Sequence, residues 1–217
     1  MNPARLLAVA VVVFAFPSVA VGAGRGSKDS PAKRAALSAA RAELLRHSDL
    51  HGWGAAAAPK KVPPLTCSAF SPSAIKPLGD AASQTFSDGS NGPFVSETAY
   101  VYSSASQEQT FWHRAVGRRL ESCVADSLTA GSTSSVTFTV SRRQLLSLPR
   151  IGARDAGYRV SGNASSTDGS QTVYLDMLVV GDGSGIAAIS FTSFFDPVAR
   201  STELRLARLV ASRMGGS

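Results

Sequence analysis

Few residues in the sequence stand at spacings that support chemistry. His47 and His51 are four residues apart with Asp49 between them, a spacing that places two metal ligands on one face of a helix. Gly52 follows directly, however, so His51 falls at or beyond a helix end and no third ligand is evident. Catalytic zinc normally has three protein ligands. We therefore expect neither a metal ion nor another cofactor.

The sequence also marks no nucleophile. It contains many serines but no G-x-S-x-G elbow, the motif that presents the catalytic serine of many hydrolases. Gly181, Gly183 and Gly185 resemble a phosphate-binding loop, but they join two strand-like segments and open no helix, which predicts a hairpin. We expect no catalytic residue. The alternative is a secreted hydrolase or isomerase with an unrecognised site, which a cluster of buried, pKa-shifted acids or histidines in one cleft would favour.

Cys67 and Cys123 are the two cysteines of the chain. In an exported chain they can form one intramolecular disulfide, closing a loop of about 56 residues that contributes on the order of 4 kcal/mol in the chain-entropy model. Two isolated cysteines lack the spacing of a zinc site, and neither has a neighbouring histidine that would indicate a nucleophile. We predict a structural disulfide.

Large aromatic residues are the remaining candidates for a ligand site. Trp53 follows a helix end beside Gly52, where it can either close the edge of a sheet or line a pocket. We favour the first role, because large aromatics usually supply buried area first. If there is a ligand cleft, we expect it between the sheet and a long helix over 103–128. Its candidate residues are Trp53, Tyr100, Trp112 and Tyr158.

The helix over 103–128 is the most distinct element of the pattern. Its apolar residues recur at helical spacing and form one stripe. They are Phe111, Trp112, Ala115, Val116, Leu120, Cys123 and Val124. Ser104 and Gln107 are placed for a capping box, in which each side chain satisfies an otherwise unpaired backbone N–H. This helix should cover one face of a sheet.

Alternating apolar and polar residues, separated by glycine-rich turns, predict the sheet. We expect strands over 94–102, 136–140, 158–165, 171–180 and 186–195, a helix over 31–47 and a short helix over 142–148. The strand over 171–180 is apolar on both faces and should be central. Asp196 and Pro197 should start a last helix that Gly215 ends. The predicted fold is α+β, an antiparallel sheet of about five to six strands with helices on both faces.

Residues 1–23 have the features of a secretory signal. Arg5 precedes an apolar run over 6–19, and Val21, Gly22 and Ala23 suit a signal-peptidase site. The run is short for a membrane span of roughly 20 residues. We expect cleavage at or near Ala23 and export. The alternative is an uncleaved N-terminal anchor, the one case in which we expect contact with the membrane.

The net charge of +7 is concentrated in the N-terminal part of the chain. Residues 24–61 contain eight Lys/Arg and three Asp/Glu, whereas 62–217 contain thirteen and twelve. We predict a basic, partly helical arm and linker over 24–61 and a single globular domain over 62–217. Because the domain is nearly neutral, we expect no nucleic-acid partner. A structural envelope protein whose arm contacts anionic polymer is a further alternative.

With these elements placed, the chain resembles the extracellular sensor-domain family of actinobacterial secreted proteins. The type member of that family is the outer domain of a mycobacterial serine/threonine kinase. The resemblance begins with Leu44-Leu45 followed by Ser48-Asp49-Leu50 and Gly52-Trp53. It continues through Cys67, Val101-Tyr102-Ser103, Phe111 and Cys123. It then includes Gly152 and Asp155 before a strand, the paired strands around 181–185 and the closing helix with Arg213. It covers roughly 44–213.

The resemblance implies a PsbP-like α/β/α sandwich and a ligand-sensing or binding role without catalysis. This chain departs from the kinase domain in having cysteines for one disulfide where that domain has two, and it carries no kinase domain. We therefore expect a secreted, monomeric binding or sensor-like module of the cell envelope. Its partner would be an unknown small molecule or envelope component.

Overall fold

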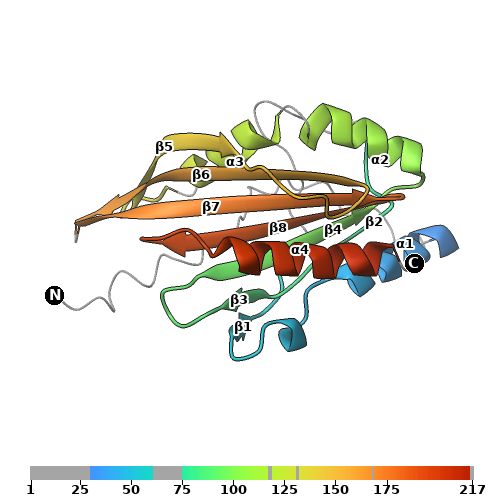
Figure 1. Cartoon of the computed structure of the whole chain (residues 1–217), viewed down its shortest axis with the longest axis horizontal. Coiled ribbons are helices and arrows are strands. Elements are labelled where there is room, and N and C mark those ends of the chain that lie inside the picture. Colours follow the sequence, from blue (N-terminus) through green and yellow to red (C-terminus); the bar gives the residue numbers. More distant parts are fainter. Residues whose placement is uncertain (1–29, 61–74, 117–118, 131, 168, 216–217) are drawn as a thin grey trace.

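One antiparallel sheet organises the part of the chain that the computed structural model describes, which is 30–60, 75–116, 119–130, 132–167 and 169–215. Within these residues the sheet has eight strands in the order β1-β3-β4-β8-β7-β6-β5, and β2 pairs with β4 (Figure 1). The strands are β1 Gly54–Ala56, β2 Gly79–Ala82, β3 Thr85–Ser87, β4 Phe94–Val101, β5 Thr137–Leu145, β6 Arg154–Ser166, β7 Gly169–Asp182 and β8 Gly185–Phe194. The helices are α1 Pro31–Glu43, η2 His47–Asp49, α2 Ala105–Phe111, η3 Trp112–Val116, α3 Leu120–Ala130 and α4 Arg200–Met214.

The predicted sheet of five to six strands is wrong, because eight strands are present in the described residues. The missed strands β1, β2 and β3 are three or four residues long and rich in Gly, Ala and Ser. Such short segments are too brief to show a repeating pattern. β2 and β3 form on the long strand β4, and β1 forms on β3. The helix predicted over 142–148 is also wrong. Strand β5 continues to Leu145 past a bulge between Val140 and Arg142, paired along its length with β6.

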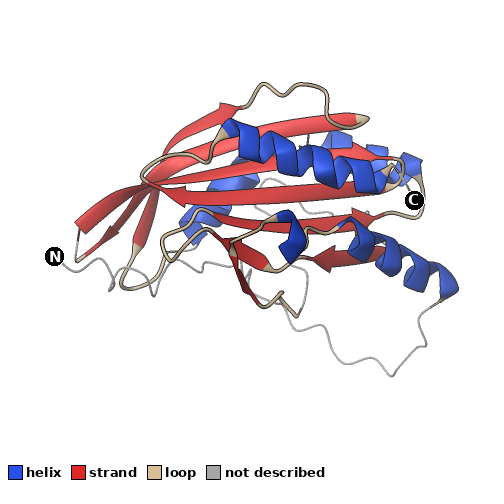
Figure 2. Ribbon diagram, turned by 60° about the horizontal axis from the view of Figure 1, so that its bottom comes forward, coloured by secondary structure: helices blue, strands red, loops and turns tan. Residues whose placement is uncertain are grey.

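Helices cover both faces of the sheet, and each face has its own core (Figures 1 and 2). On one face, α3 packs on β5, β6 and β7, and α2 on β8. We call this the α3-side core; its members include Tyr100, Tyr102, Phe111, Trp112, Leu120, Phe138, Tyr158 and Leu175. On the other face, α4 packs on β7 and β8. This α4-side core includes Leu50, Phe86, Leu178, Ile189, Phe191, Leu206 and Val210.

Helix α1, from the segment expected to be an arm, packs against β2 and β4. Its Ala36 and Ala40 are buried against Ala81 and Ala99. The approach is so close that a Cβ on Gly79 would lie 2.4 Å from the backbone nitrogen of Leu37. Small residues on both partners permit this contact. Helix α1 is therefore part of the packed body of the domain.

The long helix predicted over 103–128 is interrupted. Helix α2 passes into one π-helical turn, η3, and α3 follows after 117–118, which lie outside the described residues. One half of the predicted capping box is present at its start, where Ser104 Oγ accepts a hydrogen bond from the backbone N–H of Gln107 at 3.2 Å. Asp196 does not cap the last helix, which begins three residues after Pro197 with Ala199 as its N-cap.

Candidate functional site

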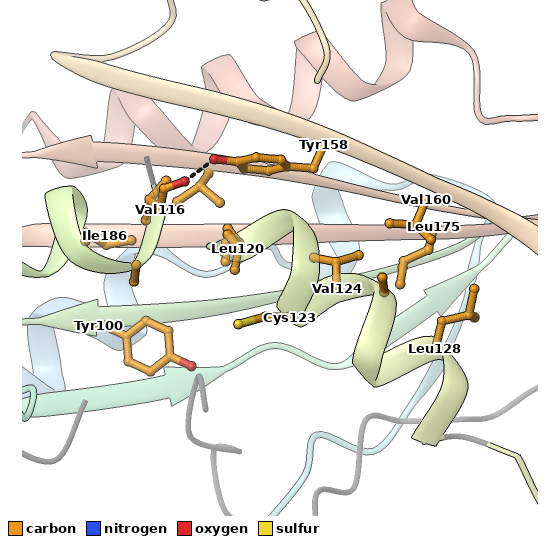
Figure 3. Close-up of a cluster of buried hydrophobic side chains, with 14 of the residues drawn as sticks. Tyr100, Val116, Leu120, Cys123, Val124, Leu128, Tyr158, Val160, Leu175 and Ile186 are labelled. Atoms are coloured by element: carbon orange, nitrogen blue, oxygen red, sulfur yellow. Dashed lines mark hydrogen bonds between the residues drawn. The ribbon is translucent and has the colours of Figure 1, made fainter. Parts of the chain in front are cut away.

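Three of the four aromatic residues predicted to line a cleft come together, and the fourth does not join them. Tyr100, Trp112 and Tyr158 are members of the α3-side core and are 6%, 8% and 4% exposed. Figure 3 shows Tyr100 and Tyr158 in one cluster with Leu120 and Cys123. Trp53 is half-buried and packs against the α4-side core, on the opposite face of the sheet.

The Tyr158 hydroxyl holds the π turn. It donates a hydrogen bond to the carbonyl of Val116, the last residue of η3 (Figure 3). A π turn shifts the regular helical hydrogen bonds by one residue, so a carbonyl at its end needs another donor. Burial raises the pKa of Tyr158 to about 12, so this hydroxyl keeps its proton at neutral pH and serves as a donor.

Trp112 lies in a similarly fixed arrangement at the hairpin between β7 and β8. The Arg154 guanidinium lies 6.0 Å from the centre of its ring and forms an ion pair with the buried carboxylate of Glu108. A Cβ on Gly181 would lie 3.1 Å from the Trp112 ring and 2.8 Å from Glu108 Oε1, so this glycine allows the ring and the carboxylate to lie directly on β7. Trp112 and Tyr158 thus have structural contacts that hold them in place.

A row of hydroxyl groups lies beside these aromatic residues on the same face of the sheet. We call Ser96, Thr98, Ser190 and Thr192 the hydroxyl strip. Ser96 lies opposite Ser190 in the pairing of β4 with β8, and alternation places all four side chains on the face that carries Tyr100. All four residues are half-buried, and no hydrogen-bond partner is present for their hydroxyls in the described part of the chain.

Apolar side chains border the hydroxyl strip. Phe94 and Phe194 meet edge to face with their ring centres 6.4 Å apart, and Met177 lies opposite Ser190 on β7. Ligand-binding surfaces commonly combine such apolar walls with a few polar groups that set the orientation. The strip carries no charged side chain, so its chemistry fits an uncharged ligand. Sequence reasoning missed it, because Ser and Thr alternating with apolar residues read as the solvated face of a strand.

Under the first turns of α4 lies a buried pair of carboxyl groups. Asp176 on β7 is 1% exposed and Glu203 on α4 is 0% exposed. Arg159 binds both oxygens of Asp176, with N–O distances of 2.6 and 2.5 Å. Arg200 lies 2.6 Å from Glu203 Oε2. Burial, and secondly the bond to Asp176, raise the pKa of Glu203 to about 8.

A second buried carboxyl pair lies near the other end of α4. Glu97 on β4 accepts a hydrogen bond from the backbone N–H of Leu45 at 2.6 Å, and Glu43 lies nearby at the end of α1. Burial raises the pKa of Glu97 to about 8 and that of Glu43 to about 7. Arg213 binds Asp49 through both nitrogens at 2.7 and 2.9 Å, and this ion pair lowers the pKa of Asp49 despite partial burial.

Buried acids with raised pKa values would favour an enzyme only if a substrate could reach them. Both carboxyls of the first pair are sealed between α4 and the sheet, with exposures of 0–1%. A general acid or base must come within hydrogen-bond reach of a substrate. In this conformation no substrate atom can reach either group, so Asp176 and Glu203 are better explained as a link between α4 and the sheet. Glu97 in turn links β4 to the segment that follows α1.

Among the described residues, no group of three or more His, Cys, Asp or Glu side chains is placed to hold a metal ion. His47 Nε2 lies 2.9 Å from the carbonyl oxygen of Trp53. No helix in the described ranges is long and apolar enough to cross a membrane. The predicted signal over 1–23 lies outside those ranges.

The disulfide stays a prediction. Cys123 is 6% exposed within the α3-side core, on the apolar face of α3 as expected. Cys67 lies outside the described residues, so the distance between the two cysteines is not part of the described structure.

Comparison with known proteins identifies a similar fold. The extracellular domain of PknH from Mycobacterium tuberculosis matches this structure with a TM-score of 0.52 and 10% sequence identity, over 84% of this chain and 97% of that chain. The two chains share a fold. No protein-family model matches the sequence, and no curated protein matches it. The resemblance inferred from the sequence is therefore confirmed for the fold, while membership of a common sequence family is not shown.

Proposed function

We propose that this chain is an extracellular binding or sensor-like module of the cell envelope without catalytic activity. The observation that carries the proposal is the fold shared with the extracellular domain of PknH over 84% of this chain. The signal-like residues 1–23 support export. The protein would act as a monomer on a small molecule or an envelope component.

The hydroxyl strip is the surface that we assign to the ligand. Its four hydroxyls can both donate and accept hydrogen bonds, and Phe94, Phe194 and Met177 can pack on apolar parts of a bound molecule. A neutral molecule with hydroxyl groups on an otherwise apolar ring, such as a sugar or other polyol, fits both properties. This location keeps the ligand on the face predicted from the sequence, next to Tyr100.

Native mass spectrometry of protein purified from the culture supernatant of its own host tests the proposal. We expect the mature chain to carry a non-covalent small molecule. Ser190→Leu should remove that molecule, because the larger side chain fills the strip. Ser161→Leu is the matched control, since Ser161 is also half-buried on a long strand but faces the opposite side of the sheet. Equal loading of both variants, or none of the wild type, would contradict the assignment.

One observation favours an enzyme as the second candidate, namely the paired carboxyls of Asp176 and Glu203 with the raised pKa of Glu203. Paired acids with separated pKa values are typical of general acid–base sites. To separate the candidates, the co-purified molecule is incubated with excess protein and its mass is followed. A binding module leaves the mass unchanged. Conversion by the wild type but not by Glu203→Gln would establish the enzyme.

A further inference from the structure

The contact between α4 and the sheet contains one carboxyl oxygen that lacks a donor. Arg159 directs Nε and Nη2 to the two oxygens of Asp176. Arg200 directs Nη1 to Glu203 Oε2 and Nη2 to the carbonyl of Ser147, at 3.0 Å. Glu203 Oε1 is buried and meets no hydrogen-bond donor in the described structure. A carboxylate oxygen in that position would lose its hydration without compensation.

The missing partner of this oxygen is the neighbouring carboxyl. Glu203 Oε1 lies 3.7 Å from Arg159 Nη2, the same nitrogen that lies 2.5 Å from Asp176 Oδ2. The two carboxyl groups are therefore adjacent, and both of their facing oxygens are acceptors when ionised. They can form a hydrogen bond only if one of them carries a proton. Arg159 already neutralises Asp176, which leaves Glu203 as the group that carries it.

We propose that Asp176 and Glu203 share one proton in the folded protein, and that this proton fastens the first half of α4 to the sheet. When α4 lifts from β7, Glu203 reaches water and releases the proton. The attachment of α4 therefore weakens as the pH rises. This inference concerns the α4 face of the sheet and does not depend on the ligand proposed for the opposite face.

The charged groups around the pair determine the pH range. Asp176 and Tyr174 face it from β7, Arg159 from β6 and Arg200 from α4 itself, while β8 contributes only neutral side chains such as Ser193. Burial, and secondly the contact with Asp176, outweigh Arg200, so the pKa of Glu203 rises from 4.5 to about 8. Opening then releases a proton at any pH between these two values, and the opening constant rises up to about tenfold per pH unit there.

A site-specific titration tests the shared proton in the wild type. The side-chain carboxyl carbon of Glu203 is followed by NMR in protein labelled with ¹³C-glutamate, from pH 4 to 9. We expect it to keep the shift of a protonated acid well above the pH at which exposed glutamates ionise. A Glu203 resonance that titrates with the exposed glutamates would overturn the proposal. This measurement needs no variant, so a folding defect cannot obscure it.

Hydrogen exchange tests the consequence for α4. With intrinsic rates corrected for pH, we expect protection of amides in 200–207 to fall by ten- to a hundredfold between pH 5.5 and 7.5. Glu203→Gln, which mimics the protonated acid, should reduce this change to within about threefold. The matched control is Glu97→Gln, which removes a buried acid facing 43–45 and should leave the change in 200–207 as in the wild type. If the protection of the wild type shows no pH dependence beyond that of Glu203→Gln, the shared proton does not hold α4 on the sheet and the proposal is refuted.

Discussion

The ion pair between Arg159 and Asp176 should be among the most costly polar contacts to break. Arg159 lies directly opposite Asp176 in the pairing of β6 with β7 and binds both of its oxygens. Arg159→Met keeps much of the aliphatic packing but leaves the Asp176 carboxylate, which is 1% exposed, without its cation. Arg200 cannot replace it without giving up Glu203 and the Ser147 carbonyl.

The expected loss can be bounded from this geometry. Removing one partner of a buried ion pair costs about 3–5 kcal/mol. The Arg159 side chain is 22% exposed, so water partly replaces it, and we expect a loss of about 3 kcal/mol in the free energy of unfolding. Asp176→Asn added to Arg159→Met should recover part of this loss, because a neutral amide is less costly to bury than an uncompensated charge.

Urea denaturation at pH 7, followed by circular dichroism, measures these losses. The control is Arg205→Met, an exposed arginine of α4 whose guanidinium donates to the carbonyl of Asp49 at 3.2 Å. It should cost less than about 1 kcal/mol. If Arg159→Met costs no more than the control, or if Asp176→Asn gives no recovery, the carboxylate is not held as we describe.

Three further perturbations have expected outcomes. The free energy of unfolding should fall as the pH rises from about 5 to 8, by up to about 1.4 kcal/mol per pH unit for Glu97, because native Glu97 holds a proton that the unfolded chain releases. Glu97→Gln should reduce the slope of urea-derived stability over that range by this amount and leave the contributions of Glu203 and Glu43. Gly181→Ala should cost about 1–3 kcal/mol in thermal or urea unfolding, since its Cβ would lie 2.8 Å from Glu108 Oε1. Cys123→Ser should cost about 2–5 kcal/mol if the disulfide exists, and intact-mass analysis with and without reductant shows whether the wild type contains it.

The long elements were predictable because each has a repeating pattern over many residues. The strands β4, β6, β7 and β8 alternate or are apolar throughout, and glycine-rich turns separate them, so only their ends differ from the prediction. The short strands β1 to β3 have no such pattern: β2 and β3 depend on β4 for pairing, and β1 depends on β3. Over 142–145 the pairing with β6 prevails over the local preference for a helix.

The candidate site was less accessible to sequence reasoning. Tyr100, Trp112 and Tyr158, which the sequence suggests as cleft residues, share the α3-side core, the face on which we propose the ligand site. Trp53 was placed with them although it packs on the other face, because nothing in a local pattern reports which face a loop residue reaches. The pair of Asp176 and Glu203 joins residues 27 positions apart, and only the register of α4 on β7 brings them together.

The most direct test of the proposed function is a crystal structure of the protein purified from the extracellular fraction of its native host. We expect residues 1–23 to be absent and density for a small uncharged molecule to lie against Ser96 and Ser190, bordered by Phe94 and Phe194. An occupied site between α4 and the sheet, at Asp176 and Glu203, would contradict the binding-module account and favour an enzyme. A full-length chain recovered only from inside the cell would contradict the extracellular role.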